Sequence, residues 1–93
     1  MTANLALVPD GQALRTEALH YDRLAQQFRR EARGFQAVAD RAADFLTPNS
    51  DRLERTRVQC MQRGYAQMAE DMLDLAAEAE VYALDARRTL GAI

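Results

Sequence analysis

Apolar residues recur along two long segments of the chain at alternating steps of three and four residues. This spacing places them on one stripe of an α-helix, as in the contact seam of a coiled coil. The first seam consists of Leu14, Ala18, Tyr21, Ala25, Phe28, Ala32, Phe35, Ala39, Ala42 and Leu46. The second consists of Val58, Met61, Tyr65, Met68, Met72, Leu75, Ala79, Tyr82 and Ala86. The pattern predicts two long helices and no strand.

Two short breaks delimit these helices. The sequences "VPDG" and "TPNSD" each combine a proline with residues that favour turns and helix caps. They divide the chain into a lead segment (1–10), a helix (11–46), a turn (47–50) and a second helix (51–90). Asp10 and Asp51 are placed to cap the two helices, and Glu54 is placed to reach back to Asp51 in a capping box.

The turn is only a few residues long and cannot bridge the length of a helix. The two helices therefore fold back on each other as an antiparallel pair. Charge supports this antiparallel pairing. Between Ala66 and Asp85 there are six acidic residues and no basic ones, whereas the facing part of the first helix carries several arginines. The predicted fold is therefore an all-α helical hairpin.

The first seam alternates small and aromatic residues. Alanines let a neighbouring helix backbone approach closely, while the aromatic side chains fill the layers between them. We expect Met61, Met68 and Met72 to lie opposite the aromatic residues, since methionine packs well against aromatic rings.

The two helices carry more apolar surface than one hairpin buries. Leu24, Val38 and Phe45 form a second row beside the first seam. Further apolar residues lie off the second seam: Leu53, Leu73, Val81 and Leu84. These rows predict a partner, either a second copy that completes a four-helix bundle or another helical-hairpin protein. The predicted partner interface consists of Leu24, Phe28, Phe35, Val38, Phe45, Met61, Met68 and Met72.

Composition narrows the function. A chain of 93 residues is one small domain, and its formal net charge of −2 does not favour binding to nucleic acid. The single cysteine, Cys60, forms neither an internal disulfide nor a CxxC metal site. The N-terminal residues have the pattern of neither a Sec signal nor a membrane span. We expect a protein–protein interaction module, with no enzymatic activity, cofactor or small-molecule substrate.

Two alternatives follow from the polar residues and from the architecture. Glu17 and His20 have the Glu-x-x-His spacing of carboxylate-bridged di-iron bundles, so dimerisation could build a ferritin-like metal site. His20 precedes a seam position, however, and is expected to point away from the core. A Cys60–His20 thiol and imidazole pair is disfavoured because both lie outside the seams. The second alternative is a cytoplasmic structural or phage-type bundle protein.

The opening "MTANLALVPDGQALRTEALHYDRLAQQF" and the tail "LAAEAEVYALDARRTL" resemble the EspC-like small helical-hairpin proteins of actinobacterial type VII (ESX) secretion. The resemblance implies a substrate or partner protein that is secreted by a non-Sec route. It also implies an export signal of the form Tyr-x-x-x-Asp/Glu. The matching residues here are Tyr82 and Asp85, although Asp85 stands one position earlier than the acid of that motif.

Overall fold

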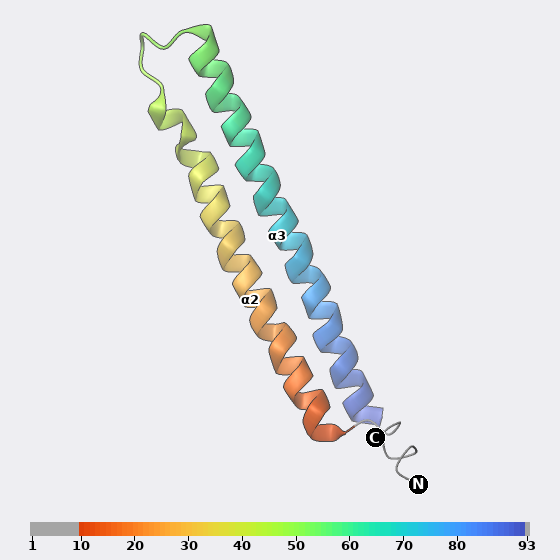
Figure 1. The fold of residues 1–93 in the computed structure, drawn as a ribbon. Coiled ribbons are helices and arrows are strands. Elements are labelled where there is room, and N and C mark those ends of the chain that lie inside the picture. The colour runs from red at the N-terminus through yellow and green to blue at the C-terminus, as the bar shows by residue number, and fades with distance from the viewer. Residues whose placement is uncertain (1–9, 93) are drawn as a thin grey trace.

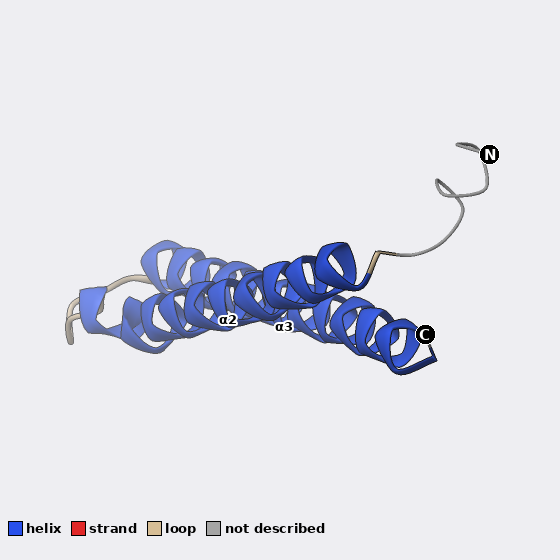
Figure 2. Ribbon diagram, turned by 90° about the horizontal axis from the view of Figure 1, so that it is seen from below, coloured by secondary structure: helices blue, strands red, loops and turns tan. Residues whose placement is uncertain are grey.

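The two periodic segments form long helices that pack side by side (Figure 1). The computed structural model describes residues 10–92, and the described elements are α2 (Gly11–Arg41), the 3₁₀ turn η1 (Ala42–Phe45) and α3 (Arg52–Ala92). The predicted all-α antiparallel hairpin is confirmed. Figures 1 and 2 show α2 and α3 running together along a narrow rod, with extents of 76 × 18 × 16 Å.

Both helices begin at the predicted aspartate caps. The Oδ1 atom of Asp10 accepts a hydrogen bond from the amide of Gln12 at 3.0 Å, and that of Asp51 accepts one from the amide of Glu54 at 2.8 Å. The reciprocal half of the capping box is not among the hydrogen bonds of the described residues. Glu54 instead lines a hollow beside Phe45, so the second helix has an aspartate cap without the back-bond.

Removing the second cap tests how much it contributes to the stability of the hairpin. Asp51→Ala is expected to lower the free energy of unfolding by about 1 kcal/mol, because one first-turn amide loses its acceptor. For a domain of this size that corresponds to a fall in Tm of about 4–8 °C. Thermal unfolding followed by circular dichroism measures it, with the exposed turn residue Asn49→Ala as control. Equal melting of Asp51→Ala and the wild type would contradict the capping role.

The first helix ends earlier than predicted. The sequence predicted one helix over 11–46, but α2 stops at Arg41 and the chain tightens into η1. The amide of Ala42 bonds to the carbonyl of Ala39, and that of Leu46 to the carbonyl of Ala43 at 3.0 Å. Such i to i−3 bonds satisfy the last carbonyls before the extended Leu46 leads into the Thr-Pro turn. The predicted lead segment 1–10 lies outside the described residues except for Asp10.

The core between the helices is built almost entirely from alanine. Among the described residues, the buried ones are Ala18, Ala25, Ala32, Ala39, Ala42, Val58, Ala69, Ala76, Ala79, Ala83 and Ala86. No large side chain among residues 10–92 is fully buried. Tyr21, Leu24 and Phe28 pack from the side against a cluster formed by three of these alanines. The helices therefore approach along a line of small residues, which we call the alanine line.

The contact line of α3 differs from the predicted seam. The sequence placed Met68, Leu75 and Tyr82 in the seam, but they are 42%, 39% and 45% exposed. The next residue in each case is buried instead, giving the row Ala69, Ala76 and Ala83. A shift of one residue turns a helix face by about 100°. Small residues on both helices allow a closer backbone approach than methionine or tyrosine would, and this favours the alanine row.

Candidate functional site: an open apolar face

Five of the large apolar side chains that the described residues leave exposed lie on one side of the hairpin: Val38, Phe45, Met68, Leu75 and Tyr82. The others, Leu19, Leu53, Leu73, Val81 and Leu84, lie elsewhere on its surface. On α3, Met61, Met68, Leu75 and Tyr82 follow one another at intervals of seven residues, which keeps them in one row when two helices coil together. On the other arm the matching row contains Leu24, Glu31, Val38 and Phe45, beside the aromatic residues of the first seam, so Glu31 interrupts its apolar residues. We call this surface the open apolar face. Its residues are Tyr21, Leu24, Phe28, Phe35, Val38, Phe45, Met61, Met68, Leu75 and Tyr82.

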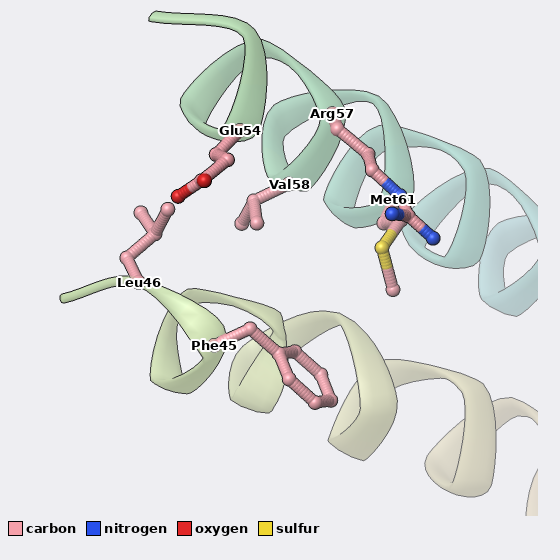
Figure 3. Close-up of a pocket in the computed structure, with 6 residues that line it drawn as sticks. All are labelled: Phe45, Leu46, Glu54, Arg57, Val58 and Met61. Carbon is pink, nitrogen blue, oxygen red and sulfur yellow. The ribbon is translucent and has the colours of Figure 1, made fainter. Parts of the chain in front are cut away.

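Two hollows mark this face, and both arms of the hairpin line each of them. The hollow near the turn is lined by Phe45 and Leu46 from one arm and by Val58 and Met61 from α3, as Figure 3 shows. Phe45 is 73% exposed there, so its ring has little of the hairpin to pack against.

The second hollow lies nearer the chain ends. Its apolar lining comprises Tyr21, Leu24, Phe28, Leu75, Ala79 and Tyr82. The rings of Tyr21 and Tyr82 meet across it, with centroids 5.2 Å apart. Between the two hollows, Phe35 and Tyr65 stack at 6.4 Å. Tyr21 and Phe35 of α2 thus pair with tyrosines of α3.

The opposite edge of the hairpin is charged. Asp22 and Arg29 each follow an aromatic of the first seam by one residue, which turns them to the other side of the alanine line. Arg29 pairs with Glu80, and Asp22 pairs with Arg87. The hydrogen bond from Arg87 lowers the pKa of the Asp22 carboxyl, and the same bond raises the pKa of the Arg87 guanidinium. Ion pairs therefore join α2 to α3 along one edge of the hairpin, and the other edge is mostly apolar.

The Asp22–Arg87 pair predicts a small dependence of stability on pH. Because the pKa of folded Asp22 lies below its ordinary value of 3.8, the pair stabilises the fold above that value, and the contribution is lost as the pH falls through the folded pKa. Asp22→Asn should therefore be less stable than the wild type at neutral pH, and the difference should shrink as the pH falls below 3.8. Urea unfolding at neutral pH and at acidic pH measures this, with Asp44→Asn as the control. A constant difference at all pH values would contradict it.

The structure brings most of the predicted interface together. Leu24, Phe28, Phe35, Val38, Phe45, Met61 and Met68 all belong to the open apolar face. Met72 is half-buried in the row of Tyr65 and Ala79, next to that face. Tyr21, Leu75 and Tyr82 were assigned to the seam and not to the interface, so the sequence reasoning missed them. The signal for Leu75 and Tyr82 was the seven-residue spacing from Met68 onwards.

The two residues of the possible export signal lie near the end of α3. The Tyr82 hydroxyl donates a hydrogen bond to Glu78 Oε1 at 3.0 Å, and this bond raises the pKa of the Tyr82 phenol. Asp85 lies 3.9 Å from Arg88 and is exposed. Tyr82 belongs to the open apolar face, whereas Asp85 stands three residues further along the helix.

The remaining candidate residues for chemistry are dispersed. Glu17, His20 and Cys60 are all exposed, and the ring of His20 packs edge-on against Tyr21. Within residues 10–92 no group of three or more His, Cys, Asp or Glu side chains is placed to hold a metal ion. Neither described helix is long and apolar enough to cross a membrane. The chain matches no family model, no curated protein and no solved structure.

Proposed function

We propose that the hairpin is a helical protein–protein interaction module that binds its partner through the open apolar face. One observation carries the proposal: the hairpin buries alanines and leaves Val38, Phe45, Met68, Leu75 and Tyr82 exposed in two neighbouring rows along one side. Full burial of a leucine, methionine or phenylalanine side chain contributes about 1.5–3 kcal/mol. In the isolated hairpin these side chains are only partly buried. A partner that covers the face buries them further and supplies the rest of this stabilisation.

The shape of the open apolar face favours a partner that makes its contacts through helices. The face follows the hairpin over most of its length, and its two rows have the seven-residue period of a coiled coil. A helix laid along this surface places its own apolar residues into the two hollows at the same period. The paired charges on the opposite edge leave that edge suited to solvent.

Chemical footprinting in native cell extract tests the proposal, because any natural partner is then present. Single cysteines are introduced in a Cys60→Ala background at Val38 and Leu75 on the face, and at Leu19 and Leu84 as controls. All four are exposed in the hairpin alone, at 42%, 39%, 52% and 46%. We expect maleimide to modify the two face positions at least tenfold more slowly than the controls. Equal rates at all four positions would refute a partner on this face.

The resemblance to EspC-like proteins extends the proposal to secretion by a type VII system. Tyr82 presents its ring on the open apolar face and Asp85 is exposed on α3, so both are available to a receptor. The tagged chain is expected in the culture filtrate of its native host, and Tyr82→Ala or Asp85→Ala is expected to keep it in the cells. Retention of the wild type in the cells would argue for the cytoplasmic bundle alternative. Export of both variants at the wild-type level would instead refute Tyr82 and Asp85 as the export signal.

A further inference from the structure

We infer that a second copy of this chain covers the open apolar face, with α2 of each copy packed against α3 of the other and both turns at the same end. This inference rests on the proposed function and names the partner. It predicts a four-helix bundle whose two-fold axis runs parallel to the helices.

Charge decides between the two ways in which two copies can face each other. Between Ala66 and Asp85, α3 has six acidic residues and no basic ones, whereas α2 has five arginines and three acidic residues between Arg15 and Arg33. If the turns lay at opposite ends, α3 would pack against α3 and place these acidic segments side by side. With the turns together, each acidic segment lies against an arginine-rich one.

Carboxylates on the rim of the face favour the same arrangement. Glu78 lines the second hollow, and Asp71 precedes it by seven residues in the same row. The ion pairs within residues 10–92 include neither of these carboxylates. If the turns lay at opposite ends, this row would meet its own copy. With the turns together it faces the rim row of α2, which has no carboxylate and consists of His20, Gln27, Gly34 and Arg41.

Two glycines provide an independent observation. Gly34 and Gly64 lie inside helices, neither has positive φ, and a Cβ built on either meets no atom within 4 Å. The hairpin alone therefore gives no steric reason for glycine at these positions. Gly64 belongs to the row of Asp71 and Glu78 on the rim of the open face, and Gly34 directly precedes the stacked Phe35. In the inferred dimer, Gly34 of one copy and Gly64 of the other lie within about one helical turn, where α2 and α3 approach closely.

A distance between spin labels on the two turns tests the arrangement. The label is attached to Asn49→Cys in the Cys60→Ala background of the purified full chain, since Asn49 is exposed in the turn and is not one of the residues of the face. We expect a single distance near the 18 Å width of the hairpin plus the label arms. A distance near the 76 Å length of the rod would place the turns at opposite ends and overturn the inference.

Absence of any distance between copies, together with a monomer mass, would also overturn the inference. The proposed function is judged separately by the footprint in native extract. Protection of Val38 and Leu75 there, combined with a purified monomer, would assign the face to a different helical protein. Lack of protection in both samples would refute both.

Substitution of the two glycines tests the close contact that the inference names. Gly34→Ala or Gly64→Ala is expected to raise helicity yet weaken the dimer, whereas the matched control Gly91→Ala, at the end of α3, leaves the dimer unchanged. An unchanged dimer in the first two variants would contradict a close approach at these glycines.

Discussion

Ala25→Leu is expected to destabilise the hairpin by about 1–3 kcal/mol, the usual effect of overpacking a close contact. Ala25 is 1% exposed and packs against Ala76 and Ala79, so a leucine side chain has no space unless the helices separate. Native domains are only marginally stable, and each kcal/mol lowers the Tm of a domain of this size by about 4–8 °C. Urea and thermal unfolding followed by circular dichroism measure the loss.

The matched control is Ala37→Leu, which makes the same change at an exposed position of α2. Leucine and alanine have similar helix propensities, so the control is expected to unfold like the wild type. A second comparison separates the two possible contact rows of α3. Ala76→Leu is expected to destabilise the hairpin, whereas the adjacent Leu75→Ala is expected to have a smaller effect on the folding of the isolated hairpin. The reverse order would restore the contact row that the sequence predicted.

Val38→Glu combined with Leu75→Glu is expected to weaken association of the chain with its partner by at least a hundredfold. These residues stand on α2 and α3 of the open apolar face and are each partly exposed, so the hairpin tolerates the change. In a complex, two carboxylates without partners would be buried in apolar contacts, which costs several kcal/mol. Since about 1.4 kcal/mol corresponds to a factor of ten in affinity, a hundredfold loss is a conservative expectation.

The control for this variant places the same two charges away from the face, as Leu19→Glu with Leu84→Glu. Both leucines are exposed, at 52% and 46%, and neither lines a hollow of the face. We expect the control to associate like the wild type and both variants to keep their helical circular dichroism. Equal loss of association in both double variants would show that charge alone, and not the face, determines binding.

The sequence predicted the hairpin and the seam of α2 because the apolar pattern of α2 allows only one choice of contact row. Alanines such as Ala25 and aromatics such as Phe28 alternate without interruption, and every predicted seam residue of α2 and the turn after it is at least half-buried. The row of Leu24, Val38 and Phe45 follows directly, since it adjoins the seam. These residues already indicated an apolar surface that the hairpin does not cover.

Half of the α3 seam was predicted correctly, since Val58, Ala79 and Ala86 are buried. The other row, with Met68, Leu75 and Tyr82, was predicted wrongly because two adjacent rows have the same period. Met68 and Leu75 belong to one row, and Ala69 and Ala76 belong to the other. The spacing alone does not show which of the two rows faces α2, and hydrophobicity favours the row of larger residues. The deciding factor is the small size of the alanines already present on α2, which makes a close approach of two small surfaces the better packing. That preference belongs to the pair of helices and not to either segment alone.

The mass of the purified chain in solution tests the central claim most directly. Sedimentation equilibrium over a range of concentrations is expected to give a wild-type mass twice the 10.5 kDa of one chain, and 10.5 kDa for Val38→Glu with Leu75→Glu. This result would show that the open apolar face is where two copies meet. A wild-type mass of 10.5 kDa at every concentration, or a dimer that both glutamates leave intact, would contradict the account.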